Sequence, residues 1–226
     1  MEVKSRRVRK FLSKKIQQLN DIVADLDTLV TELGTEFYRV SIFGSARIKP
    51  DTDDYKRVYD LACLLAKKGA DIVTGGGPGL MEAANSGAKK GSTQSRSFGL
   101  PIELPFEADA NSHLDVKYQH RRFSSRLDEF MRISHAVVIT PGGIGTLLEL
   151  FYTWQLIQVK HISERPIILL GDMWEGLLQW LTEQPLKSEL LDPTDMNQLI
   201  LAHSVEEVMN HLAPAIDDFN QHRLNH

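Results

Sequence analysis

Short runs of β-branched and apolar residues alternate along this chain with stretches of helical periodicity, and this alternation constrains the fold more than any other feature. The runs span residues 38–43, 71–74, 95–100, 135–140 and 166–171, and a run at 199–204 is a candidate sixth strand. Helical spacing of apolar side chains marks residues 55–68, 80–90, 118–133, 146–159 and 205–212. The pattern predicts an α/β fold: a Rossmann-like, mostly parallel sheet with helices on both faces.

The same patterning divides the chain into three segments. Residues 1–34 are predicted to be an N-terminal helical extension, because apolar residues from Ile16 to Leu33 recur every three or four positions before Gly34. Residues 35–214 form the predicted Rossmann-like domain, and residues 215–226 a solvated C-terminal tail. The apolar stripe of the extension fits packing on its own domain, packing across a homodimer, or binding of a partner helix.

Charge and hydropathy exclude several classes of protein. The net charge is −4 and the pI about 6.1, so no global positive field exists to collect nucleic acid or an anionic membrane. The basic N-terminus lacks the apolar run of a secretory signal, and the longest apolar runs are strand-length. A mitochondrial transit peptide is disfavoured because an acidic helical pattern follows directly. We therefore expect a cytoplasmic protein, in which the single cysteine, Cys63, is a buried thiol.

Three of the predicted strands end in loops of small residues that lead into helices. The loops are FGSAR at 43–47, TGGGPG at 74–79 and TPGGIG at 140–145. In parallel sheets ligands bind beyond the carboxyl ends of the strands, where helix N-termini point outward. The candidate ligand-binding residues in and beside these loops are Gly44, Ser45, Gly76, Glu82, Gly142, Gly143, Gly145 and Thr146.

The third loop is the strongest candidate for a phosphate site. Glycines let backbone N–H groups approach a phosphate, and the helix dipole favours its negative charge. Neither the Walker pattern nor the complete dinucleotide fingerprint occurs, so an ordinary ATPase or NAD enzyme is not expected. The alternative is a tight turn in which Thr146 caps the helix and Glu149, three residues later, reaches back as a capping-box acid.

Arginines precede the fourth strand in the segment HRRFSSRLDEFMR. Arg121, Arg122, Arg126 and Arg132 all have side chains suited to a bidentate grip on phosphate. Solvation, or pairing with Asp128 and Glu129, is the alternative for each of them. No spacing of His, Cys or acidic residues suggests a metal site, and no cofactor is predicted.

These motifs together resemble the Lonely Guy family, cytokinin riboside 5′-monophosphate phosphoribohydrolases long mislabelled as lysine decarboxylases. The resemblance covers about residues 40–171 and rests on PGGxGTxxE at Pro141–Glu149, on Arg126, and on FGSAR, GGGPGLMEAA and GLPIELPFE in the expected order. Three positions depart from the common pattern, namely Leu127, Ile144 and Leu148. The departures bear on the cytokinin substrate more than on the fold.

The resemblance implies a homodimer or larger homo-oligomer that cleaves a nucleoside 5′-monophosphate, with Arg126 and Glu149 as catalytic residues. The expected substrate is AMP or an N6-modified AMP, and the products are the free base and ribose 5-phosphate. Glu82 either binds ribose or base or is a helix N-terminal acid. The alternative function is a non-catalytic carrier or sensor of a nucleotide or of molybdenum cofactor. Lysine decarboxylation is not expected, because no lysine has a recognisable pyridoxal-phosphate context.

Overall fold

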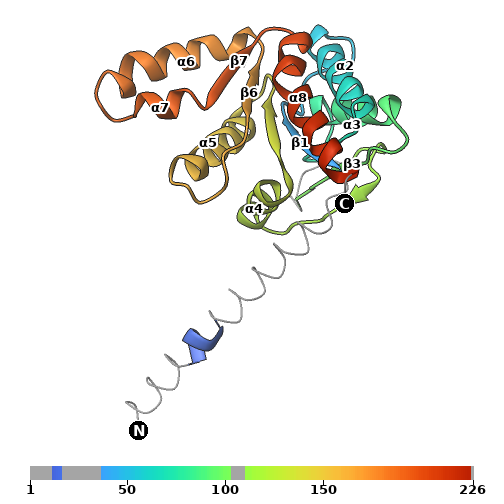
Figure 1. The fold of residues 1–226 in the computed structure, drawn as a ribbon, viewed down its shortest axis with the longest axis horizontal. Coiled ribbons are helices and arrows are strands. Elements are labelled where there is room, and N and C mark those ends of the chain that lie inside the picture. Colours follow the sequence, from blue (N-terminus) through green and yellow to red (C-terminus); the bar gives the residue numbers. More distant parts are fainter. Residues whose placement is uncertain (1–11, 17–36, 103–109, 225–226) are drawn as a thin grey trace. The chain divides into compact units, whose positions relative to one another are not determined.

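The computed structural model describes residues 12–16, 37–102 and 110–224 (Figure 1). Residues 12–16 are helical, and the rest of the predicted N-terminal helix lies outside the described residues. Contacts within the chain divide it into one unit at Met1–Glu36 and a second, larger unit at Phe37–His226. The second unit contains all the candidate site residues.

A seven-stranded sheet forms the centre of the larger unit, in the order β4-β3-β2-β1-β5-β6-β7. The strands are β1 (Tyr38–Phe43), β2 (Ala70–Thr74), β3 (Ser97–Gly99), β4 (Val116–Lys117), β5 (Ala136–Ile139), β6 (Ile167–Leu170) and β7 (Leu199–Ala202). Every pairing between these strands is parallel. The predicted α/β, Rossmann-like sheet is therefore confirmed, with β4 as a strand that the sequence analysis missed.

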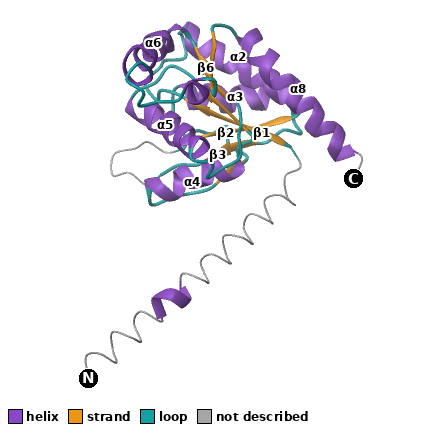
Figure 2. Cartoon of the chain, turned by 60° about the vertical axis from the view of Figure 1, so that its left-hand side comes forward, coloured by secondary structure: helices purple, strands orange, loops and turns teal. Residues whose placement is uncertain are grey.

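Helices cover both faces of this sheet, as predicted (Figures 1 and 2). On one face lie α2 (Asp53–Lys67), α3 (Leu80–Gly91) and α8 (Val205–Leu224); on the other lie α4 (Phe123–Ile133), α5 (Ile144–Gln158) and α6 (Glu175–Leu181). Successive residues of β5 alternate between the two cores: Ala136 and Val138 pack with the first set of helices, Val137 and Ile139 with the second. Strands buried on both sides read as continuous apolar runs, which is why they were recognisable.

The segment between β6 and β7 is more helical than the sequence indicated. It contains a 3-10 helix, η1 (Asp172–Trp174), then α6, a π-helix, η2 (Thr182–Leu186), and α7 (Pro193–Met196). An Asp192 capping box starts α7. Trp174 and Leu181 bury the segment against the core beside α5, so it is an integral part of that layer.

The prediction for the C-terminal end was wrong. The closing helix was expected at 205–212, followed by a solvated tail, but α8 continues to Leu224 with Pro214 inside it. Ile216 is fully buried, and the ring of Phe219 packs edge-on against Tyr38 at 5.8 Å between centroids. These apolar contacts offset the helix hydrogen bond that a proline removes.

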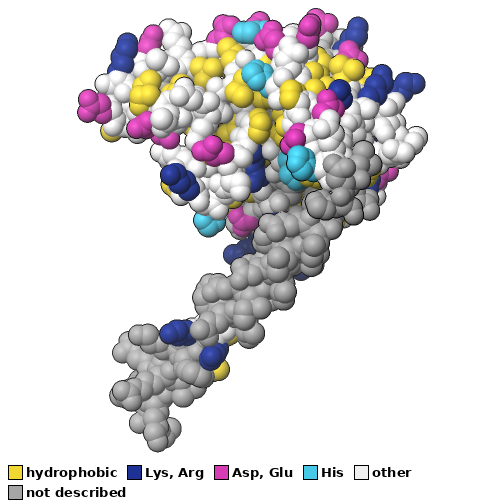
Figure 3. All heavy atoms as spheres, viewed as in Figure 1, with side chains coloured by type: hydrophobic (Ala, Val, Ile, Leu, Met, Phe, Trp, Pro, Cys, Tyr) yellow, Lys and Arg dark blue, Asp and Glu magenta, His cyan; other side chains and the backbone are white. Residues whose placement is uncertain are grey.

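On the face drawn in Figure 3, acidic and basic side chains are interspersed over the described residues. None of the helices in the described part of the chain is both long enough and apolar enough to cross a membrane.

Candidate active site

The three glycine-rich loops meet at the carboxyl edge of the sheet, where the strand order reverses between β1 and β5. The backbone N–H of Ser45 donates to the carbonyl oxygen of Pro141 at 3.0 Å, and the N–H of Leu80 donates to that of Ser45 at 2.9 Å. The loop after β1 is thus hydrogen-bonded to both of the others. In doubly wound sheets this position is where ligands bind.

Helix α5 presents an uncapped N-terminus to this edge. Its N-cap is Gly143, with φ −100° and no side-chain hydrogen bond, and the helix begins at Ile144. A methyl group added at Gly143 or Gly145 would meet no atom within 4 Å. The first turn thus has open space beside two of its glycines, and the first N–H groups of a helix have no partner within the helix, which together fit an anion site.

The structure contradicts the alternative in which Thr146 caps this helix. Thr146 lies inside the first turn and is buried, and its hydroxyl lies so close to Gly142 that a methyl group there would overlap it. Gly142 is therefore required by this close approach, whereas Gly143 and Gly145 have no such neighbour.

Arg126 and Glu149, the two predicted catalytic residues, lie side by side. Arg126 projects from α4 and Glu149 from α5, with 3.8 Å between Nη2 and Oε1. Their side chains are only 14% and 12% exposed. The Nε–H of Arg126 donates to the carbonyl oxygen of Leu100 at 2.7 Å, which fixes the guanidinium relative to β3. The sheet edge thus holds a buried ion pair beside an anion-attracting helix end.

Burial makes the Glu149 carboxyl a weaker acid than an ordinary glutamate. Loss of solvation raises its pKa from 4.5 to about 7, and the positive charge of Arg126 opposes this rise in part. A buried carboxyl with a pKa near neutrality and a specific charge partner is typical of functional sites.

The other predicted residues fall into two groups: two whose polar side chains are near the sheet edge, and two glycines that the fold itself requires. Ser45 is half-buried, and its Oγ accepts from the N–H of Arg47 at 3.1 Å. Glu82 lies in the first turn of α3, and its charge acts on the hydroxyl of Tyr55 in α2. At Gly44 and Gly76 the protein itself requires glycine: a methyl group at Gly44 would overlap the Thr140 hydroxyl, and Gly76 has φ +76°.

The arginines at 121 and 122 precede α4 and are exposed, and Arg132 forms an ion pair with Glu129 at 2.6 Å. Only Arg126 of the four reaches the carboxyl edge beside Glu149. Sequence reasoning missed Met81, whose sulfur lies next to Gly75 beside the Arg126 guanidinium. The position of Met81 directly after GGGPGL was the available signal.

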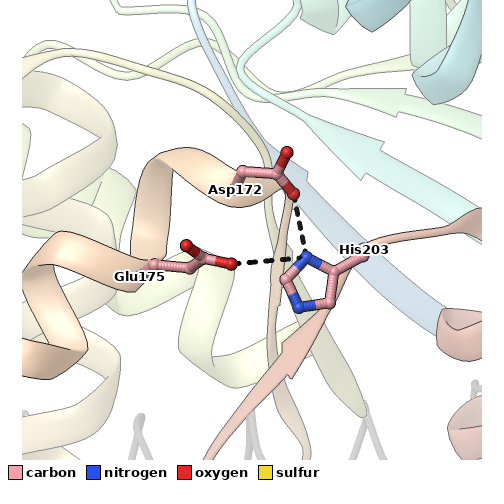
Figure 4. Close-up of side chains that lie close together, drawn as sticks. All are labelled: Asp172, Glu175 and His203. Carbon is pink, nitrogen blue, oxygen red and sulfur yellow. Dashed lines mark hydrogen bonds and ion pairs between the residues drawn. The ribbon is translucent and has the colours of Figure 1, made fainter.

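Asp172, Glu175 and His203 form a second cluster, which sequence spacing did not suggest. Nδ1 of His203 lies 2.8 Å from Asp172 and 3.8 Å from Glu175 (Figure 4). The ligand atoms of all three are near enough together to hold one metal ion, although each side chain is exposed. Asp172 and His203 follow the neighbouring strands β6 and β7, and this shared placement was the missed signal. The hydrogen bond to Asp172 raises the pKa of His203, which accounts for the pair without a metal.

Fold and site together define an α/β protein with an uncapped helix N-terminus and a buried Arg–Glu pair at its topological switch point. The family described as "Possible lysine decarboxylase" matches residues 81–212, more than half of the sequence, and the chain belongs to this family. Membership of the Lonely Guy family, expected from the motifs, is thereby confirmed.

Two curated relatives have informative names. A pyrimidine/purine nucleotide 5′-monophosphate nucleosidase of Escherichia coli strain K12 is 34% identical over 109 residues, which cover 45% of this chain and 24% of the relative. The chain thus matches about a quarter of that protein's length. A probable cytokinin riboside 5′-monophosphate phosphoribohydrolase of Oryza sativa subsp. japonica is 26% identical over 182 residues, 79% of this chain and 84% of the relative.

Among solved structures, the molybdenum cofactor binding protein of Rippkaea orientalis is similar with a TM-score of 0.59. The sequences are 24% identical, and the similarity covers 81% of this chain and 99% of the other. At this identity the likeness shows a shared fold and gives no information about function.

Proposed function

We propose that the protein hydrolyses the N-glycosidic bond of a nucleoside 5′-monophosphate. The observation that carries this proposal is the buried Arg126–Glu149 pair beside the open N-terminus of α5. A phosphate bound at the helix end would fix the sugar relative to the Glu149 carboxylate. The relatives' names supply the reaction class.

In this mechanism the bond between C1′ and the base nitrogen breaks, and the bonding electrons leave with the base. Positive charge develops on the ribose, so a carboxylate beside the ring stabilises the transition state and orients the attacking water. The water oxygen adds to C1′, and one of its protons ends on the base. Glu149 is the carboxylate, while Arg126 holds the phosphate or assists departure of the base.

The phosphate is expected to bind to the N–H groups of the 142–146 loop, with help from Ser45. Open space at Gly143 and Gly145 supports this assignment, because a close-fitting anion needs that space. AMP or an N6-modified AMP is the proposed substrate. Adenosine should be spared, because without a phosphate nothing anchors the sugar.

A homodimer is the proposed assembly. Ile144, Leu148 and Phe151 are 88%, 45% and 38% exposed at successive turns of α5. An apolar stripe of this kind on a surface helix favours burial against another copy. Light scattering of the purified protein tests this, and a monomeric mass would reject it.

The competing function is a non-catalytic carrier or sensor that uses the same fold. A pure anion binder has no evident use for a buried carboxylate next to its ligand, because the two negative charges repel each other. Glu149 therefore favours the enzyme.

Incubation with a panel of nucleoside monophosphates, followed by measurement of ribose 5-phosphate, separates the two functions. We expect ribose 5-phosphate from at least AMP with the native protein and almost none with Glu149→Gln. Tight AMP binding without any product, with every base tried, would favour the carrier.

A further inference from the structure

A network of side-chain amides holds the GGGPG loop (Gly75–Gly79). Its centre is Asn85, a fully buried residue of α3. Asn85 Oδ1 accepts from the Thr74 hydroxyl at 2.7 Å and from Asn111 Nδ2 at 3.0 Å. Asn85 Nδ2 donates to Ser97 Oγ at 2.8 Å and to the carbonyl oxygen of Phe98 at 3.3 Å. The amide thus uses both acceptor and both donor positions.

Asn111 connects this buried amide to the loop itself. Its backbone N–H donates to the carbonyl oxygen of Gly76 at 2.8 Å, and its Nδ2 donates to that of Gly77 at 3.0 Å. Two consecutive carbonyl groups of the loop are thereby directed toward Asn111. A third contact closes the network, because the N–H of Gly76 donates to the Thr74 hydroxyl at 2.9 Å.

The first glycine of this loop, Gly75, lies against Arg126. A methyl group added at Gly75 would overlap Nη2 of Arg126, the nitrogen nearest to Glu149. The loop therefore limits where the guanidinium can lie, while its Nε–H is held by Leu100. Displacement of the loop would remove one of the two restraints on Arg126.

We propose that Asn111 is a positioning residue: it holds the GGGPG loop against Arg126 and so keeps the guanidinium within reach of Glu149. The inference rests on the proposed function for its effect on turnover, but the positioning itself exists in the free protein. Asn111 is only half-buried and belongs to neither apolar core, so we expect its substitution to leave the sheet and both cores in place.

Asn111→Asp is the sharpest variant. It keeps the shape of the side chain and the acceptor for the N–H of His113, removes both Nδ2 hydrogen bonds and sets a carboxylate against the Gly77 carbonyl. Ser112→Asp is the matched control, because it adds the same charge at the exposed neighbouring residue, which has no bond in the network.

Kinetics on AMP should show a fall in kcat of about 10²-fold for Asn111→Asp relative to Ser112→Asp, as expected for misplacement of a catalytic group. KM should change much less, since the phosphate site on α5 belongs to another loop. A merely structural defect would instead lower the amount of folded enzyme and leave kcat per folded molecule unchanged.

The decisive measurement needs no substrate. The carboxyl band of Glu149, identified by its loss in Glu149→Gln, can be titrated by difference infrared spectroscopy in the free protein. Arg126 is the charged group that acts on Glu149 among the described residues, so retreat of Arg126 should move this titration to higher pH in Asn111→Asp than in Ser112→Asp. Asn111→Ala, which adds no charge, should shift it in the same direction and replaces Asn111→Asp if that variant does not fold.

An identical Glu149 titration in the Asn111 variants and in Ser112→Asp would overturn the inference, whatever their activity. If the native protein cleaves no monophosphate but the titration shifts, the proposed function fails and the positioning role stands.

Discussion

Gly79 and Gly143 occupy the same position in two parts of the molecule, each as the N-cap of the helix that follows a strand, and neither helix has a side-chain cap. Gly79 has φ +69°, and a methyl group there would collide with the backbone of Ser45 and Ala46. Gly143 has φ −100° and open space around it. Glycine is required at position 79 by the fold itself. At position 143 a larger residue would meet no other atom of the protein, so the space there could accommodate a ligand.

The difference teaches how to interpret glycine-rich loops at a sheet edge. The GGGPG loop is tied to Asn85, Asn111 and the loop after β1, so its glycines serve close packing. The loop before α5 has open space at Gly143 and Gly145, so these two glycines leave room for the ligand that we propose. We therefore expect changes in the first loop to act on the fold and on Arg126, and changes in the second to act on binding.

The largest effect on activity is expected at Glu149, which lies in α5, the helix that follows the Gly143 loop. Glu149→Gln should lower kcat by about 10³-fold, because it keeps the shape and removes a charge that matters in the transition state. AMP binding measured by calorimetry should persist. Turnover equal to that of the native enzyme would remove Glu149 from the mechanism.

The next effect is a pH dependence of both activity and stability that comes from Glu149. With Glu149 active as a carboxylate and a pKa of about 7, kcat/KM should fall about tenfold per pH unit below that value. The folded carboxyl titrates above its ordinary 4.5, so the folded state binds more protons between these values. The free energy of unfolding should therefore decrease as pH rises from 4.5 to about 7, by at most about 3 kcal/mol.

Denaturant melts between pH 4.5 and 7 check the expected decrease in the free energy of unfolding. In the control, Glu149→Gln, the pH dependence due to Glu149 should disappear. Activity that instead rises toward acid pH would assign Glu149 the role of a proton donor.

Gly79→Ala tests the packing side of the comparison. The forced positive φ and the collision with Ser45 should cost about 2 to 3 kcal/mol of stability, measured by urea unfolding. Binding of AMP by the folded fraction should change less than stability does. A melt like that of the native protein would mean that the loop adapts easily and that the comparison is overstated.

Gly143→Ala is the matched change on the ligand side. Loss of a glycine N-cap should cost less than about 1 kcal/mol, while the methyl group should raise the dissociation constant for AMP about tenfold or more by blocking close approach. Calorimetry and melts on the same preparation separate the two. Unchanged affinity would show that the phosphate binds elsewhere, and the central assignment would fall with it.

The smallest effect is expected for His203→Ala. The cluster of Asp172, Glu175 and His203 lies at the same sheet edge, but its exposed residues are not part of the proposed mechanism. Activity should match the native enzyme and be insensitive to EDTA. An EDTA-sensitive loss of turnover would instead bring a metal into the reaction.

Much of the fold followed from the sequence because buried parallel strands are continuous apolar runs. The strand β1 was predicted at its observed limits, 38–43. The two residues of β4 are too few to show a pattern, and the short helices between β6 and β7 depend on burial of Trp174 and Leu181, which is a tertiary property. The closing helix was expected to end at 212, but α8 continues through Pro214, and the burial of Ile216 that accompanies this is a tertiary property.

The site was predictable where one motif carries the chemistry. Arg126 and Glu149 were named from the sequence, and the structure brings them within 3.8 Å. Which glycines have open space beside them was not predictable, because Gly44 and Gly143 differ only in what other segments place beside them. Asn85 and Asn111 were missed for the same reason, because their hydrogen-bond partners come from other segments: β2, β3 and the GGGPG loop after β2.

The packing of α8 on β1 has a consequence for biosynthesis. Tyr38 opens β1, the first strand among the described residues, and its ring is covered by His135 and by Phe219 of α8. A nascent chain cannot cover Tyr38 until the residues beyond Pro214 have left the ribosome. Affinity tags, reporters and truncations placed in this helix would therefore act on the central strand, although α8 lies far from β1 in the sequence.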